Sequence, residues 1–404
     1  MNCDVLVVGG GAVGLATAAG LCAAGFSVVV VDAASASPRA PSGAFDLRVS
    51  ALTRAAENVL TRLGAWPRMD PMRLAPFEQM RVWDSAVSGE LQFGAEDIGE
   101  PYLGTLAENA NVVAALTAVL REDYAERCHW RLPGLLEALH CDASGAVARV
   151  SGEHIRAGLV VGADGSNSKV RELLGLQTRV RDYQQSAVVA TLRTQLSHQS
   201  TAWQRFLANG PIAMLPLPGE FTSIVWSTTP DEAAELISMP TLAFNQRVAE
   251  ALDHRFGEVV WSGERGRFAL RRVEATAYVA ERAVLVGDSA HTIHPLAGQG
   301  LNLGLMDAAA LCEVLEHARR RDREFATRSV LRRYERWRKT QNVLTQNAMD
   351  ALRWFFADRP LPIRIVREIG MHGVNALTPL KRELSRTASG IIGDLPALAR
   401  PLRT

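Results

Sequence analysis

The first 32 residues restrict the fold of this 404-residue chain most strongly. Val5–Val8 predicts a buried strand, Ala12–Ala24 a helix, and Phe26–Val31 a second buried strand. Between the first strand and the helix stands a G-x-G-x-x-G turn made by Gly9, Gly11 and Gly14. Asp32 ends the second strand. The distance in sequence from Gly14 to Asp32 is close to the roughly 20 residues that separate the glycine turn of a dinucleotide site from the acid that holds the ribose. We therefore predict a βαβ unit that binds a dinucleotide. The alternative is a tight turn without a ligand.

The same segment has no charged residue between Asp4 and Asp32, and an uncharged stretch of this length is also a feature of membrane spans and signal peptides. Six glycines interrupt it, however, and no basic residues precede it. We expect a folded unit here and no transmembrane helix elsewhere.

Charge and cysteine usage narrow the functional classes further. A net charge of +1 is too small for a nucleic-acid-binding protein. The five cysteines are odd in number and form no C-x-x-C pair, which is typical of a reduced, cytoplasmic chain.

No second G-x-G-x-x-G follows the first, so a second dinucleotide would have no Rossmann domain of its own.

A second informative stretch is VLVGDSAHTIHPLAGQGLNLGLMDAAAL, residues 284–311. Its opening apolar run, Ala283–Val286, predicts a short buried strand that Gly287 and Asp288 terminate. A carboxylate at the end of a parallel strand faces the crevice where such sheets bind cofactors. Asp288 could there accept hydrogen bonds from the hydroxyl groups of a sugar-like chain.

A glycine loop and a helix follow that strand. Gly298 and Gly300 let the backbone approach a flat ligand closely, because they have no Cβ. The helix expected from Gly300 or Leu301 offers free N–H groups and a partial positive charge at its start. A reduced flavin, whose polar edge becomes anionic, suits this position. The alternative is a core helix with no ligand at its start.

Two other site types are not favoured. His291 and His294 have the i, i+3 spacing of metal ligands, but no third ligand is near them in sequence, so we expect no metal. The chain also has no G-x-S-x-G elbow of a hydrolase.

Together with LVVGADGSNSKVRELLG (159–175), these stretches resemble the FAD-dependent aromatic-ring hydroxylases related to para-hydroxybenzoate hydroxylase. The run HPLAGQGLNLGLMDA is most similar to the hydroxylases of ubiquinone biosynthesis. The resemblance implies that Asp288 holds the ribityl chain of FAD and that the following loop lies against the flavin ring. The residues it places there are Pro295, Gly298, Gln299, Gly300, Leu301 and Asn302.

The resemblance also assigns residues elsewhere. Arg48, in DLRVSAL, would meet FAD, although it could be only a surface charge. Asn109 would touch the flavin from the first turn of a helix, or would merely cap that helix. Asp164, in a motif with Gly162, Gly165, Ser168 and Arg171, would serve FAD and the passing nicotinamide cofactor.

The fold expected is α/β: a Rossmann-type, glutathione-reductase-like FAD domain, a substrate domain built on an antiparallel sheet, and C-terminal helices. The FAD domain would comprise 1–72, 100–178 and 270–335. The substrate domain would comprise 73–99 and 179–269, and the helical region 336–404.

The resemblance implies a monooxygenase with no protein nucleophile. NAD(P)H, expected to be NADPH, would bind transiently and reduce FAD, and O₂ would give a C4a-hydroperoxide that hydroxylates a polyprenylated phenol in ubiquinone biosynthesis. Two alternatives stay open: a hydroxylase of a soluble phenol, and a non-catalytic flavin-binding subunit of a quinone-biosynthesis complex. The ring carbon, the tail length and the substrate base are not predicted.

The C-terminal part combines arginines with aromatic residues, as in LRRYERWRKTQN (331–342) and around Arg353, Arg364 and Arg367. This predicts either solvated helix faces packed on the FAD domain or a basic surface for anionic lipid or a partner protein. The second option would place the chain peripherally at the inner membrane face.

Overall fold

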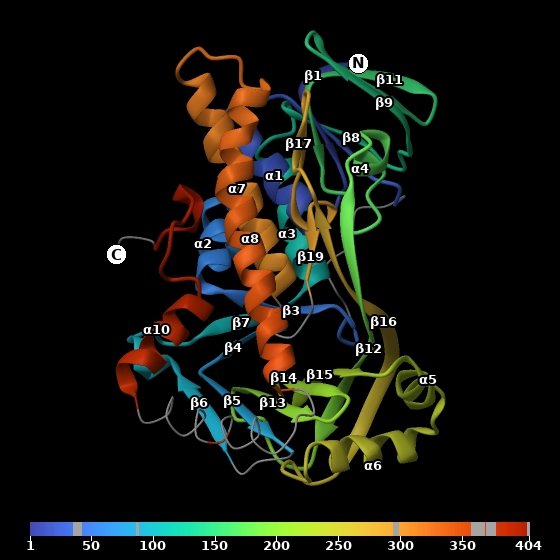
Figure 1. Cartoon of the computed structure of the whole chain (residues 1–404), viewed down its shortest axis with the longest axis vertical. Coiled ribbons are helices and arrows are strands. Elements are labelled where there is room, and N and C mark those ends of the chain that lie inside the picture. The colour runs from blue at the N-terminus through green and yellow to red at the C-terminus, as the bar shows by residue number, and fades with distance from the viewer. Residues whose placement is uncertain (35–42, 86–88, 294–298, 357–367, 369–376, 402–404) are drawn as a thin grey trace.

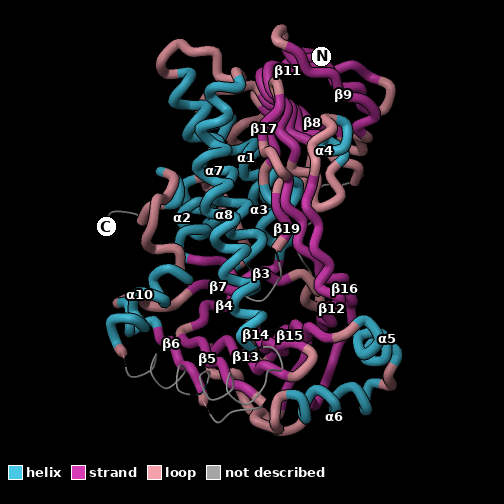
Figure 2. Tube along the Cα trace, viewed as in Figure 1, coloured by secondary structure: helices cyan, strands magenta, loops and turns pink. Residues whose placement is uncertain are grey.

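The computed structural model describes residues 1–34, 43–85, 89–293, 299–356, 368 and 377–401. The molecule is elongated, and two long strands, β12 (Thr178–Thr194) and β16 (Val259–Ala275), run from its upper part into a lower sheet (Figure 1). Helices gather on one side of the upper part and strands on the other (Figure 2). The α/β architecture with a second, antiparallel sheet is confirmed.

The upper sheet has a parallel centre in the order β18-β11-β1-β2-β8. Its strands are β1 (Asn2–Val8), β2 (Val28–Val31), β8 (Cys128–Arg131), β11 (Glu153–Gly162) and β18 (Ala283–Leu285). The antiparallel strands β9 (Leu136–Asp142), β10 (Gly145–Val150) and β17 (Val279–Ala280) extend it. Every residue of β2 is buried, as expected of a parallel strand covered on both faces.

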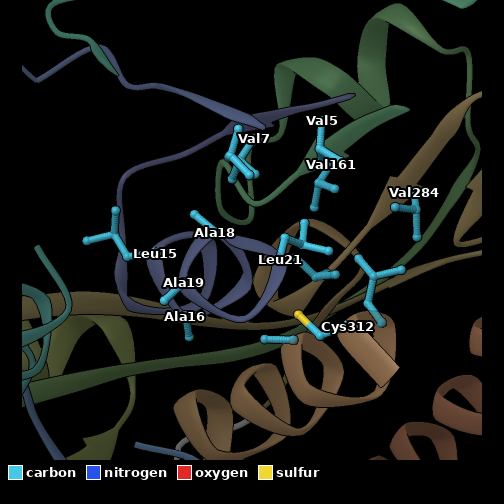
Figure 3. Close-up of a cluster of buried hydrophobic side chains, with 14 of the residues drawn as sticks. Val5, Val7, Leu15, Ala16, Ala18, Ala19, Leu21, Val161, Val284 and Cys312 are labelled. Atoms are coloured by element: carbon cyan, nitrogen blue, oxygen red, sulfur yellow. The ribbon is translucent and has the colours of Figure 1, made fainter. Parts of the chain in front are cut away.

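Helix α1 (Ala12–Ala23) packs between this sheet and α7 (Gln299–Arg319) (Figure 3). Small residues allow the close approach of the two helices, because a Cβ on Gly20 would lie 2.6 Å from the Sγ atom of Cys312. Helix α3 (Asn109–Glu122) also contacts α1, and α8 (Arg328–Phe356) packs on α7. The core thus fixes the start of α1 at the carboxyl edge of the sheet.

The lower sheet runs β19-β16-β12-β15-β14-β13-β5-β6, and only its β5–β13 pair is parallel. Its other strands are β5 (Gln79–Asp84), β6 (Glu90–Gly94), β13 (Thr201–Leu207), β14 (Gly210–Pro216), β15 (Phe221–Thr228) and β19 (His291–Thr292). Two helices that the sequence analysis did not predict, α5 (Pro230–Ser238) and α6 (Thr241–Ala251), cover one face. A signal for α5 was present, since Thr229 caps it and Pro230 opens it.

A small third sheet, β3-β7-β4, lies between the two larger ones (Figure 1). It consists of β3 (Val49–Thr53), β4 (Leu74–Phe77) and β7 (Gly104–Glu108). The remaining elements are α2 (Arg54–Arg62), α4 (Lys169–Leu173), α10 (Thr378–Ala388) and short 3₁₀ turns at Trp66–Arg68, Pro71–Arg73, Ala95–Ile98, Gly287–Ser289 and Ala397–Ala399. The domain limits stay a prediction. Helix α8 is continuous across the limit predicted between residues 335 and 336.

The arginines predicted to form a basic surface in the C-terminal part are not all exposed. Arg353 is half-buried and stacks 4.6 Å from the ring centroid of Tyr183, whereas Arg364 and Arg367 lie outside the described residues. Phe356 stacks on Phe206 of the lower sheet, with 4.0 Å between ring centroids. Over the described ranges, no helix has the length and apolarity that crossing a membrane requires.

Candidate flavin site

In the glycine turn between β1 and α1, there is space for a side chain at Gly11 but not at Gly9 or Gly14. A Cβ on Gly9 would lie 2.2 Å from the carbonyl oxygen of Ala163, and one on Gly14 would lie 2.0 Å from that of Gly9. The fold itself therefore requires these two glycines. A Cβ on Gly11 would meet no other described atom within 4 Å, and the φ of Gly11 is an ordinary −76°. Gly11 leaves free space at the start of α1, where an anionic pyrophosphate would fit.

The Asp32 carboxylate lies against this turn. Its Oδ2 accepts a 2.6 Å hydrogen bond from the Gly10 N–H, and its Oδ1 accepts one of 2.8 Å from the Ala34 N–H. Asp32 is thus fixed at the end of β2, beside the glycine turn, and its role in holding the ribose stays a prediction.

Asp164 organises the loop after β11. Its Oδ1 accepts a hydrogen bond of 2.5 Å from the Ser168 hydroxyl, and its Oδ2 accepts one of 3.0 Å from the Val170 N–H. Both oxygens therefore have partners within the loop. Arg171 donates from Nη1 to the Ser289 carbonyl at 2.8 Å, which joins this loop to the turn that carries Asp288.

The turn after β18 presents Asp288 to solvent. Gly287 has φ +59°, a conformation that side chains other than glycine's rarely adopt, and Ser289 is buried. The Asp288 side chain is exposed on its open side, while the protein around it partly desolvates it and raises its pKa. His291 and Arg48 oppose this rise electrostatically. Asp288 is therefore an accessible acceptor with a cation beside it.

The start of α7 is the third element of the site. A Cβ on Gly300 would meet no described atom within 4 Å, and the first N–H groups of an α-helix have no partner within the helix. The Asn302 amide is buried instead against β3, where it accepts from the Thr53 N–H at 2.9 Å and donates to the Ala51 carbonyl at 2.8 Å. The side chain of Asn302 therefore holds α7 in place. Leu301 is half-buried against the core.

Three of the residues predicted near the flavin ring lie in or directly after the undescribed segment 294–298. Pro295 and Gly298 lie outside the described residues, and Gln299 is the first residue of α7. Their proximity to the flavin ring stays a prediction.

Asn109 does not cap α3, because the N-cap residue is Glu108. Its Oδ1 accepts from the Ser50 hydroxyl at 2.7 Å, and its backbone N–H donates to the Arg48 carbonyl at 2.9 Å. The alternative of a helix cap is therefore wrong. Asn109 fixes the backbone at Arg48, whose exposed guanidinium lies 5.5 Å from the Phe268 ring centroid.

The open spaces at Gly11 and Gly300, the accessible carboxylate of Asp288 and the nearby cation Arg48 fit FAD. The family model described as "FAD binding domain" matches residues 2–348. The chain is 35% identical over 389 residues to the 3-demethoxyubiquinol 3-hydroxylase of Escherichia coli, covering 96% of this chain and 98% of that one. The chain belongs to the family of FAD-dependent ubiquinone-biosynthesis hydroxylases. It is a flavin monooxygenase.

A second relative supports this family assignment, and a solved structure supports the fold. A ubiquinone hydroxylase of Rhodospirillum rubrum is 35% identical over 402 residues, covering 99% of the monooxygenase and 92% of the relative. The crystal structure of p-nitrophenol 4-monooxygenase from Pseudomonas putida superposes with a TM-score of 0.77 at 19% identity, covering 96% and 97% of the two chains. This second likeness concerns the fold alone.

The monooxygenase contains a buried ion pair that the sequence analysis missed. Arg73 and Glu108 pair at 2.7 Å between Nη2 and Oε1, and the side chain of Glu108 is fully buried. Glu108 also accepts from the Asp46 N–H, and Arg73 donates to the carbonyls of Gly43 and Ala44. The pair thus holds the segment that leads to Arg48. The two residues are 35 positions apart, so no local pattern identifies them as partners.

Beside that segment lies a cavity of about 620 Å³. Its lining residues are Gly43, Ala44, Phe45, Asp46, Leu47, Thr191, Arg193, Phe221, Trp261, Gly263 and Glu264. The aromatic walls suit an apolar or aromatic ligand, and the volume is within the usual range of small-molecule sites.

Replacing Asp288 by Ala tests the cofactor placement in the monooxygenase. The change removes an acceptor for the ribityl hydroxyl groups, and leaving such groups unpaired costs about 1–3 kcal/mol. We expect FAD affinity to fall by that amount in a fluorescence titration. Unchanged affinity would contradict the placement of the ribityl chain at Asp288.

Proposed function

We propose that the monooxygenase hydroxylates the aromatic ring of a polyprenylated phenol in ubiquinone biosynthesis, with NAD(P)H as reductant and O₂ as oxygen donor. The observation that carries this proposal is the 35% identity to 3-demethoxyubiquinol 3-hydroxylase over nearly the whole of both chains. The candidate flavin site supports it, since Gly11 and Gly300 leave open space at the starts of α1 and α7.

When bound, FAD supplies the redox chemistry, and the protein supplies binding, orientation and shielding. Gly11 and the start of α1 would receive the pyrophosphate. Asp288 would accept from the ribityl hydroxyls, and the N–H groups at the start of α7 would face the polar edge of the flavin ring. Arg48 would balance negative charge near Asp288.

The lower sheet and α8 would shield the reaction from water. Phe356 packs on Phe206 and Val82 at the end of α8, and Asp350 ties the same helix to Tyr183 through a hydrogen bond of 2.5 Å. Excluding water favours transfer of oxygen to the substrate over its loss as H₂O₂.

A direct assay tests the proposal. The purified holoprotein is incubated with NADPH or NADH, O₂ and a short-chain prenylated phenol, and product mass, H₂O₂ and NAD(P)H oxidation are measured. We expect faster NAD(P)H oxidation with the phenol and a product heavier by one oxygen atom. Stimulation only by unprenylated phenols would favour a soluble substrate. FAD retention without stimulation by any phenol would favour a non-catalytic subunit. Deleting the gene should also make the unhydroxylated quinone precursor accumulate.

A polyprenyl tail partitions into membrane, so the substrate must be reached at the bilayer surface or delivered by a partner protein. Three apolar side chains of α8 are exposed, those of Leu344, Leu352 and Trp354. We propose that these side chains and the exposed arginines of the same helix contact anionic membrane, an attraction that weakens with salt.

Flotation with anionic vesicles tests the membrane contact. We expect weak binding at low salt that falls at high salt and falls further in a Leu352→Ser, Trp354→Ala variant. Leu242→Ser, at an exposed leucine on α6, is the matched control. Absence of binding at low salt, with partner proteins removed, would eliminate direct contact and leave delivery by a protein complex.

A further inference from the structure

Helix α8 carries a row of polar residues on its buried face. Tyr334, Arg338, Asn342, Gln346 and Asp350 recur every four residues, which places them on one side of the helix. The first four are at most 2% exposed. Burying polar side chains costs free energy unless each finds a partner, so the partners of this polar row indicate what it does.

The partners of the polar row extend along the molecule. The Tyr334 hydroxyl donates to the Leu285 carbonyl at the end of β18, at 2.9 Å. The Gln346 amide donates to the Thr292 carbonyl at 3.3 Å. Asp350 accepts from the Tyr183 hydroxyl and pairs with Arg272 on the two long strands. One helix face therefore contacts the upper sheet at the end of β18 and the lower sheet at β19, β12 and β16 (Figure 1).

The centre of the polar row contacts Asp307 of α7, whose carboxylate is fully buried. Its Oδ1 accepts from Arg338 Nε at 2.8 Å and from the Asn342 amide at 3.1 Å. Burial alone would raise the pKa of Asp307, but His291 and Arg338 hold it well below its usual range. This lowered pKa and the donors around both of its oxygens favour the carboxylate form of Asp307.

The other oxygen of Asp307 faces the turn that carries Asp288. Oδ2 accepts from the Gly287 N–H at 3.1 Å and also contacts the Nε2 atom of His291. Because an ionised carboxylate can only accept, the Nε2 atom of His291 must carry the proton of this hydrogen bond. One buried oxygen thus holds the turn on both sides of Asp288, whose own carboxylate stays exposed.

We propose that Asp307, held by Arg338 and Asn342, is a positioning residue for the cofactor: through Gly287 and His291 it fixes the turn so that Asp288 is directed at FAD. This inference rests on the proposed placement of FAD at Asp288. The alternative is that the buried cluster stabilises the fold and contributes nothing specific to FAD binding.

The variant His291→Leu tests the proposal without breaking the ion pair, because Asp307 keeps Arg338, Asn342 and Gly287 as partners. We expect FAD affinity to fall roughly tenfold, the effect of losing one hydrogen bond to a charged group, and the FAD-induced rise in Tm to shrink. His291→Gln, which retains an N–H donor, should recover most of both effects. Tyr334→Phe is the matched control, since it removes a buried hydrogen bond of the same row that does not involve Asp307. It should lower the Tm of the apoprotein and leave FAD affinity unchanged.

A double-mutant cycle with Asp288→Ala separates the two accounts. If His291 acts through Asp288, adding His291→Leu to Asp288→Ala should weaken FAD binding no further, so the two losses are not additive. Additive losses, or a His291→Leu variant with unchanged FAD affinity while Asp288→Ala binds more weakly, would overturn the proposal. An Asp288→Ala variant that binds FAD normally would instead overturn the cofactor placement on which it rests.

Discussion

A Gly11→Val variant is expected to fold normally and to purify largely without FAD. Gly11 is the N-cap residue of α1 and has an ordinary φ of −76°, and a Cβ there would meet no other described atom within 4 Å. The valine side chain would therefore occupy only the space through which the pyrophosphate approaches the backbone. The measurements are the flavin absorbance of the purified protein and the Tm of its apo form, which should match that of the unaltered apoprotein.

Gly14→Ala provides the contrasting control for this experiment. Its Cβ would lie 2.0 Å from the carbonyl oxygen of Gly9, so the backbone must shift, and we expect a lower Tm even without FAD. The two variants separate a glycine that the ligand requires from one that the fold requires. Full flavin absorbance in Gly11→Val would show that Gly11 is not at the pyrophosphate.

The parts of the fold that the sequence predicted are those encoded within short segments. The βαβ unit is one, because Val5–Val8, the glycine turn and Asp32 lie within about 30 residues of one another. The strand and turn that end in Asp288 are another. In both, hydrophobic runs and glycines determine local structure almost independently of the rest of the chain.

Interactions between distant segments were not predictable in this way. The family resemblance places Asn302 in the flavin loop, which stays a prediction, but it gave no sign that the side chain bonds the backbone of β3, some 250 positions earlier. The basic segment 331–342 predicted either solvated helix faces packed on the FAD domain or a basic interaction surface, but its Arg338 is 2% exposed and pairs with Asp307. Both roles depend on which segment packs opposite, and a single sequence does not contain that information.

The second large effect is expected at the ion pair of Arg73 and Glu108. In an Arg73→Met variant the Glu108 carboxylate stays buried and keeps the Asp46 N–H, but it loses its cation. Breaking a buried pair from one side typically costs about 3–5 kcal/mol. We expect a loss of that size in the free energy of unfolding, measured with denaturant. Arg193→Met, which breaks the exposed pair with Glu220, should cost about 1 kcal/mol or less.

The pair should also affect FAD binding, because Arg73 and Glu108 hold residues 43–46, directly before Arg48. A double variant, Arg73→Met with Glu108→Gln, separates the two consequences. It removes the uncompensated charge, so much of the lost stability should return, as expected when both partners of a buried pair become neutral. FAD affinity should stay reduced, because the hydrogen bonds from Arg73 to the Gly43 and Ala44 carbonyls are still missing. Recovery of both stability and affinity would mean that the pair serves only the fold and that Arg48 keeps its position without it.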